Sequence, residues 1–287
     1  MIPPPPGGNS REGVWCEPQS HRPFFYRVWI PAQATRLLVI IHGFGEHGGR
    51  YRPVAEGLAG QGLAVAVADL WGHGRSGGSR GDAEGVMRYV DDVHAVTSQV
   101  FLPMVGVSSF AVYGHSAGGL LAIHWALRQP TGLAWLIIQS PLLELGLSVP
   151  SWKAALARWL GRWWPSARLA MNLDAQALSH NAEVVRAYRD DRLVHNRMSA
   201  RIYGGILQAG VEALAQAHRI DLPTLLLYGE ADRIVSIAAA QRWFNALRCQ
   251  KRLVSFPGAY HELHHETVRG EVFRLIREWT APPVATP

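Results

Sequence analysis

The chain has 287 residues, of which 48% are hydrophobic, and its mean hydropathy is 0.00. These values are typical of a soluble globular protein with one large core, or with a core that carries an inserted subdomain, and they exclude a fibrous or membrane-embedded chain. The formal net charge is +6, but the arginines that supply it are scattered without a run of five or more, which argues against nucleic-acid binding.

Residues 1–21 predict an N-terminal extension that is partly disordered, because Pro3–Pro6 favours an extended chain. This segment lacks the basic start and apolar stretch of a signal peptide, and no apolar run in the chain reaches the length of a transmembrane segment. Cys16 and Cys249 form no metal-like spacing. We therefore expect a cytoplasmic chain with reduced cysteines.

From residue 22 the chain alternates apolar strands with helical stretches. Strands are expected at 24–30, 36–41, 63–69, 110–113 and 134–139, and helices at 52–58, 86–100 and 120–127. Several of the strands are continuous apolar runs, as in strands that are buried on both faces. The alternation therefore predicts an α/β fold with a parallel sheet covered by helices.

This alternation stops near Pro141 and resumes at residue 218. Residues 141–217 show helical periodicity and no convincing strand. Beyond them, strands are expected at 224–228 and 252–256, and helices at 237–247 and 266–279. We therefore expect an α/β core built from 22–140 and 218–280, a helical cap at 141–217, and a C-terminal tail at 281–287.

One helical face of the expected cap carries several large apolar residues, namely Trp152, Leu156, Trp159 and Trp163. The simpler interpretation is that this face packs against the rest of the insertion. The alternative is a lid whose tryptophans meet an apolar substrate or a lipid surface. On that alternative, Trp152 and Trp159 are candidate substrate-binding residues.

The segment Gly114–Gly119 has the sequence GHSAGG and fits the G-x-S-x-G pattern of a nucleophile elbow. A strand precedes it and a helix follows, so a sharp turn with small flanking residues would present Ser116 at the end of the sheet. Serine is a weak nucleophile at neutral pH and needs a general base, which in turn needs an orienting acid.

The candidate base and acid follow the last two expected strands. Asp232 comes after the strand at 224–228 and is the best candidate for the acid, with Glu230 as its rival. His261 follows the strand at 252–256 through a glycine-containing loop, and His264 and His265 are neighbours that could mislead. The chain order serine, acid, histidine is the order of α/β-hydrolases.

Two backbone N–H groups are expected to hold a developing oxyanion. One belongs to Ala117, which follows the nucleophile, and the other to Phe44 in the loop after the strand at 36–41. Substrate-binding residues are expected beside these groups, at His42, Gly43 and His115.

Together these motifs resemble the monoacylglycerol lipase and lysophospholipase branch of the α/β-hydrolases, and the resemblance runs from about residue 22 to 279. The segments that carry it are 42–51, 69–76, 114–119, 229–235 and 259–262. The resemblance implies a mostly parallel eight-stranded sheet with a helical cap after strand six, and hydrolysis of acylglycerols or related lipid esters. One departure is Ala117, where relatives often carry methionine.

Two rival motifs occur in the same chain. His261–His265 fits H-E-x-x-H, a zinc-protease pattern with His261 and His265 as ligands and Glu262 as base, but it begins in a Pro-Gly loop. Gly72–Gly77 fits G-x-G-x-x-G, with Asp92 about twenty residues later, but the expected helix does not open inside the glycines. Neither pattern has the context that its chemistry requires.

The sequence therefore predicts a serine esterase that acts on monoacylglycerols, lysophospholipids or short to medium acyl esters, without metal or other cofactor. The expected partners are a small-molecule acyl ester or lipid substrate and, transiently, a lipid surface at the cap, and the chain is expected to be a monomer or homodimer. The alternative enzyme is a peptidase of the proline iminopeptidase type, which would need a cap acid to hold a substrate amine; the candidates are Glu144, Asp174, Glu183, Asp190 and Asp191. A non-catalytic binding protein on the same scaffold is a further alternative.

Overall fold

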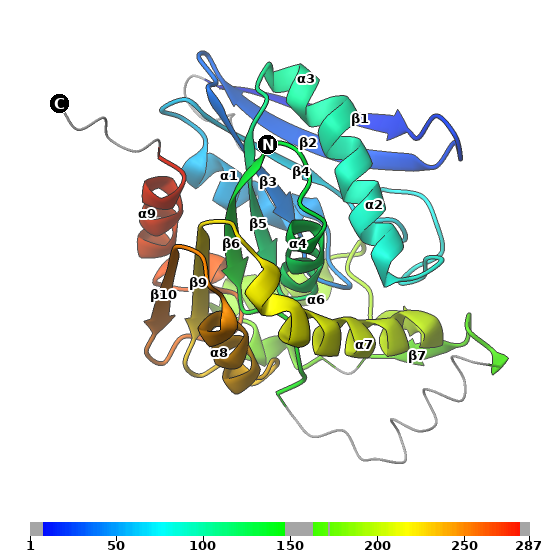
Figure 1. The fold of residues 1–287 in the computed structure, drawn as a ribbon. Coiled ribbons are helices and arrows are strands. Elements are labelled where there is room, and N and C mark those ends of the chain that lie inside the picture. The colour runs from blue at the N-terminus through cyan, green and yellow to red at the C-terminus, as the bar shows by residue number, and fades with distance from the viewer. Residues whose placement is uncertain (1–7, 147–162, 172, 282–287) are drawn as a thin grey trace.

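A single eight-stranded sheet forms the centre of the computed structural model, which describes residues 8–146, 163–171 and 173–281 (Figure 1). Its order is β1-β2-β4-β3-β5-β6-β9-β10; β1 and β2 are antiparallel to their neighbours, and the other strands run parallel. The strands are β1 (Gly8–Cys16), β2 (Pro23–Pro31), β3 (Arg36–Ile41), β4 (Leu63–Ala68), β5 (Phe110–His115), β6 (Leu133–Gln139), β9 (Thr224–Gly229) and β10 (Lys251–Phe256).

Helices cover both faces of this sheet. Side chains of α1 (Arg52–Leu58) and α9 (Arg269–Trp279) share one hydrophobic core. Those of α2 (Val86–Val96), α4 (Ala117–Leu127), α7 (Ala200–Gln216) and α8 (Ile237–Ala246) share the other. Strand β3 contributes to both cores, because Leu37, Val39 and Ile41 lie on one side and Leu38 and Ile40 on the other. This alternation confirms the predicted α/β sheet, buried on both faces.

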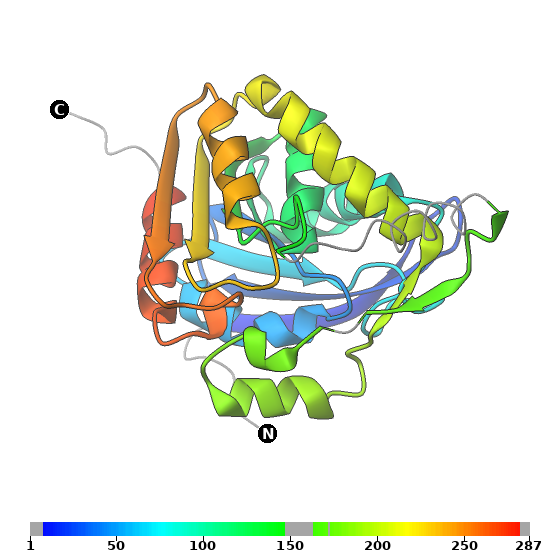
Figure 2. The same ribbon diagram turned by 90° about the horizontal axis from the view of Figure 1, so that it is seen from below.

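Several elements form from residues 163–216, in the segment expected to be the cap. They are β7 (Arg168–Ala170), η3 (Ala175–Ala177), α6 (Ala182–Asp190), β8 (Arg197–Ser199) and α7. Figure 2 shows α6 and α7 on opposite sides of the molecule. Because α7 also packs on α4 and α8, part of the cap completes the cover of the sheet.

The structure corrects the sequence-based expectation in three places. Residues 8–16 form the edge strand β1 within the expected N-terminal extension. The prediction that 141–217 contains no strand was wrong, since β7 and β8 pair antiparallel, although three residues are too few to show a strand period. The helix predicted at 266–279 begins only at Arg269, because η5 (Leu263–His265) and a turn precede it.

Further short helices connect the larger elements. They are η1 (Gly48–Tyr51), the π-helix η2 (Thr97–Phe101), α3 (Leu102–Val105) and η4 (Ala217–Arg219). The helix expected at 86–100 is therefore α2 followed by η2. Within the described ranges, no helix is both long and apolar enough to cross a bilayer.

The tryptophan face predicted for the cap is described only in part. Trp152, Leu156 and Trp159 lie outside the described residues, so their predicted roles are untested. Trp163 and its neighbour Trp164 are described, and their exposed fractions are 68% and 65%.

Candidate active site

Ser116 occupies the turn between β5 and α4. Every other residue from Phe110 to Ala126 is buried, and Ser116 alone is partly exposed. Its backbone has φ 54° and ψ −120°, a strained conformation for a residue with a side chain. The serine is also the N-cap of α4, so the free N–H groups of the first helical turn lie beside it.

The flanking glycines explain how this strained turn is packed. A Cβ placed on Gly114 would lie 2.5 Å from the carbonyl oxygen of Gly118, and one placed on Gly118 would lie 2.1 Å from that of Ile41. Both contacts are with backbone atoms, which cannot move aside cheaply. The sequence motif therefore reflects close packing of β5, α4 and the end of β3.

Asp232 and His261 meet at the carboxyl ends of β9 and β10. His261 Nδ1 donates to Asp232 Oδ2 at 2.7 Å, and both side chains are almost completely buried. Asp232 Oδ1 accepts from the backbone N–H groups of Ile234 at 2.8 Å and Val235 at 3.2 Å. The rival Glu230 is exposed and accepts from Ser255 Oγ instead.

The charges of this pair support each other. Burial alone would lower the pKa of His261, but the adjacent Asp232 carboxylate outweighs it and raises the pKa above 6.5. Burial alone would raise the pKa of Asp232, but His261 and the two N–H donors hold it below 3.8. The His261 ring also lies 4.7 Å from the ring of His115, the residue before Ser116.

The loop after β3 packs directly against the elbow. A Cβ placed on Gly43 would lie 3.5 Å from Ser116 Cβ. The Gly43 N–H donates to Glu46 Oε1 at 2.6 Å, and Tyr51 donates its hydroxyl proton to the same oxygen at 2.8 Å. Phe44 is half-buried, and its ring meets that of His73 edge-on at 4.7 Å.

Two residues predicted to bind substrate are instead enclosed by protein. The His42 ring is fully buried; its Nδ1 lies 2.7 Å from the carbonyl oxygen of Gly43, and its Nε2 accepts from the Leu70 N–H at 2.9 Å. The His115 ring is 2% exposed and lies 3.0 Å from Gln139 Nε2 through its Nδ1. Burial lowers the pKa of both imidazoles, that of His115 to about 3. These neutral rings brace the loop and the elbow.

The residues of the H-E-x-x-H pattern do not form a zincin helix. His261 bonds Asp232, and His264 and His265 belong to the short η5. Potential ligand atoms of Glu262, His264 and His265 lie within 4.8 Å of one another. However, both Glu262 oxygens accept from Arg50, whose cation repels a metal ion.

The glycine-rich segment after β4 holds the cap rather than opening a helix. The Ser199 N–H donates to the carbonyl oxygen of Gly81 at 3.0 Å, and Arg201 pairs with Asp82 through two bonds of 2.8 Å. The acid of the dinucleotide pattern, Asp92, is buried in α2 and paired with Arg22. The geometry therefore does not fit a dinucleotide site.

Comparisons with known proteins found similar sequences and a similar solved structure. Residues 32–268 match the family model described as serine aminopeptidase, S33. The chain is 34% identical to mouse monoglyceride lipase over 91% of this chain and 88% of that protein, and 30% identical to the monoacylglycerol lipase of Mycolicibacterium smegmatis over 88% and 91%. It also resembles the crystal structure of Paleococcus ferrophilus monoacylglycerol lipase, with a TM-score of 0.80 and 33% identity over 89% of this chain and 97% of that one.

Proposed function

The chain belongs to the serine aminopeptidase S33 family of α/β-hydrolases and is a carboxylic ester hydrolase, and we propose that it cleaves monoacylglycerols or similar acyl esters through Ser116, His261 and Asp232. The observation that carries this proposal is the buried bond between His261 Nδ1 and Asp232 Oδ2, with the His261 ring 4.7 Å from that of His115, the residue before the partly exposed Ser116 in its strained turn. An imidazole held in this way keeps its second nitrogen for proton transfer.

In the proposed reaction, His261 takes the proton of Ser116 as the serine oxygen attacks the ester carbonyl. The Asp232 carboxylate stabilises the imidazolium that forms, and the backbone N–H groups of Phe44 and Ala117 hold the oxyanion. His261 then gives its proton to the leaving alcohol, and water hydrolyses the acyl-enzyme by the same route. Each step uses only groups of this chain, the substrate and water.

The nature of the substrate is proposed from the relatives and from the cap. The names of the mouse and mycobacterial relatives specify monoglyceride or monoacylglycerol lipases. The exposed Trp163 and Trp164 give the described part of the cap an apolar surface that suits transient contact with lipid.

The acids of residues 141–217 give the aminopeptidase alternative less support than the relatives give the esterase. Glu144 pairs with Arg242, Asp174 caps η3, and Asp191 lies 2.8 Å from His47 Nε2. Glu183 and Asp190 are exposed. A peptidase of this type needs an acid that is free to hold a substrate amine. Glu144, Asp174 and Asp191 already have partners within the protein.

The test is hydrolysis of p-nitrophenyl acyl esters, then a panel of monoacylglycerols, lysophospholipids and an aminoacyl amide. Ser116→Ala is expected to lower kcat by several orders of magnitude, about 10⁴-fold or more, and to abolish labelling by a fluorophosphonate probe. Near wild-type turnover by Ser116→Ala would refute the proposal. Faster cleavage of the aminoacyl amide than of every ester would favour the peptidase.

A further inference from the structure

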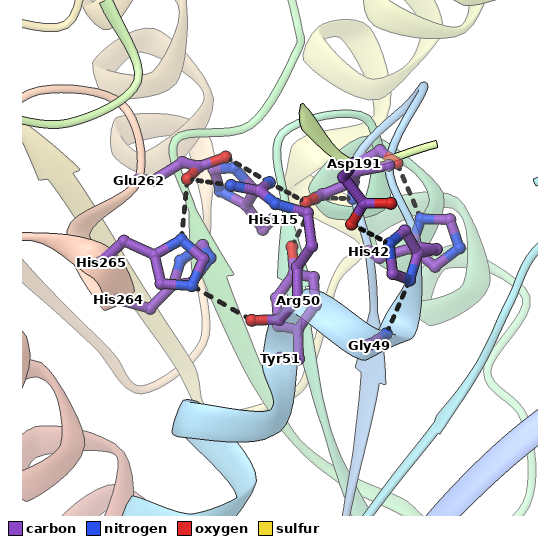
Figure 3. Close-up of polar contacts among 12 residues, drawn as sticks. His42, Gly49, Arg50, Tyr51, His115, Asp191, Glu262, His264 and His265 are labelled. Carbon is purple, nitrogen blue, oxygen red and sulfur yellow. Dashed lines mark hydrogen bonds and ion pairs between the residues drawn. The ribbon is translucent and has the colours of Figure 1, made fainter. Parts of the chain in front are cut away.

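A buried ion-pair network that the proposed reaction does not use connects the loop after β3 to the loop after β10 (Figure 3). Arg50 donates from Nη1 to Glu262 Oε1 at 2.6 Å and from Nη2 to Glu262 Oε2 at 2.7 Å. Arg50 Nη1 also donates to Glu46. The exposed fractions of the three side chains are 8% or less.

Each end of this network is attached to backbone that the proposed reaction requires. Glu46 Oε1 accepts from the N–H of Gly43, whose neighbour Phe44 supplies one proposed oxyanion donor. At the other end, Glu262 directly follows His261 in the chain. The path from the Phe44 backbone to His261 therefore passes through one guanidinium and two carboxylates.

His265 contacts both Glu262 and the backbone of Arg50. Its Nδ1 lies 2.8 Å from Glu262 Oε2, and its Nε2 lies 3.1 Å from the carbonyl oxygen of Arg50. The Glu262 N–H donates to the carbonyl oxygen of Leu178 at 2.8 Å. Glu262 is thus fixed at its side chain and its backbone, which leaves His261 little freedom to shift.

Both carboxylates are charged in this setting. Burial alone would raise the pKa of Glu46 and Glu262, but the Arg50 cation outweighs burial and lowers both. A two-bond guanidinium–carboxylate contact has a fixed planar geometry. The contact therefore sets both the distance and the orientation between the two loops.

From this geometry we infer that Arg50 and Glu262 are positioning residues, whose ion pair holds the Phe44 N–H and His261 in the mutual arrangement that oxyanion binding and proton transfer both require. The inference rests on the proposed function. Neither side chain touches the reacting atoms, so the pair acts on kcat through placement of other groups, and binding of the substrate acyl chain is not its task.

The test compares Glu262→Gln and Arg50→Lys with wild type by kcat, KM, Tm and the pH profile of kcat/KM on a p-nitrophenyl ester. Gln keeps the shape of Glu262 without its charge, and Lys keeps the charge of Arg50 without the planar pair of donors. Asp92→Asn is the matched control, because it breaks a two-bond contact with Arg22 of similar burial that touches neither loop.

We expect Glu262→Gln and Arg50→Lys to lower kcat about ten- to a hundredfold, with KM changed less than about threefold. Asp92→Asn is expected to lower Tm by a similar amount with kcat unchanged. The charged groups that act on His261 are Asp232, Glu262 and Glu46, and the titratable His115 ring beside it is neutral. Glu262→Gln removes a negative charge that raises the pKa of His261. The acid limb of its pH profile should therefore move to lower pH.

A purely structural pair would move Tm and leave kcat in place, and that result would overturn the inference. If Glu262→Gln does not fold, Glu262→Asp and Arg50→Lys supply the same comparison, and wild-type kcat in both would also overturn it. A wild-type chain that hydrolyses no acyl ester and takes no fluorophosphonate label would instead refute the proposed function, and the inference with it.

Discussion

Replacing Asp232 by asparagine is expected to inactivate the protein through the position of one proton. Asp232 Oδ1 accepts from two backbone N–H groups, those of Ile234 and Val235, and Oδ2 accepts from His261 Nδ1. In Asp232→Asn the amide oxygen must take the place of Oδ1, because only an acceptor fits two donors. The amide NH₂ then faces His261 Nδ1, which places the imidazole proton on Nε2 and removes the base that Ser116 needs.

The size of this effect follows from the cost of turning the amide over. The opposite orientation leaves the N–H groups of the half-buried Ile234 and the buried Val235 without an acceptor, at about 1 kcal/mol or more each. The competent tautomer is therefore disfavoured by at least about 2 kcal/mol, which is about thirtyfold in rate. The neutral amide also no longer stabilises the imidazolium, and the total loss expected for such a triad is about 10⁴-fold in kcat.

The assay is kcat on a p-nitrophenyl acyl ester, with circular dichroism and Tm to establish that the variant is folded. Glu230→Gln is the matched control: Glu230 follows the same strand, is exposed, and accepts from Ser255 Oγ. Its kcat is expected within about twofold of wild type, as for a surface change. A folded Asp232→Asn variant with kcat within about tenfold of wild type would refute the tautomer argument.

Two further predictions concern pH and the elbow. Because His261 must be neutral to accept a proton and Asp232 raises its pKa above 6.5, kcat/KM should fall as pH drops through a midpoint above 6.5; a pH–rate profile whose acid midpoint lies well below 6.5 would contradict this. Gly118→Ala should lower kcat about 100-fold and stability by about 1–3 kcal/mol, because its Cβ would lie 2.1 Å from the carbonyl oxygen of Ile41. Gly204→Ala in α7, where a Cβ meets nothing within 4 Å, is the control and should leave kcat unchanged in the same denaturation and kinetic measurements.

The strands of the core could be predicted because their signal is local. A strand buried on both faces is a continuous apolar run, and β3 was predicted with the bounds that it has in the structure. Edge strand β1 carries no such run: Arg11 and Glu12 are exposed, and it lies at the sheet margin. Its strand conformation comes from pairing with β2, which the segment's own composition does not reveal.

The positions of three candidate site residues could also be predicted from the motifs around them. Ser116 is marked by the two glycines that its turn requires, and Asp232 and His261 by their places after strands. The roles of His42 and His115 could not be predicted, since the sequence does not show whether an imidazole beside a nucleophile faces the substrate or the core. The Arg50–Glu262 contact could not be predicted, because it joins residues 212 positions apart and no local pattern marks it.

Glycine-rich loops connect the cap to the candidate site. The His195 N–H donates to the carbonyl oxygen of Gly45 at 2.8 Å, directly after Phe44, and the Ser199 N–H donates to that of Gly81 at 3.0 Å. A Cβ on either glycine would strike cap backbone, at 2.5 Å and 1.9 Å. Since Gly45 adjoins a proposed oxyanion donor, the cap holds one side of this loop while Glu46 and Arg50 hold the other. The position of the Phe44 N–H thus depends on the cap as well as on the core, so a substitution at the His195 contact can change kcat without touching the reacting groups.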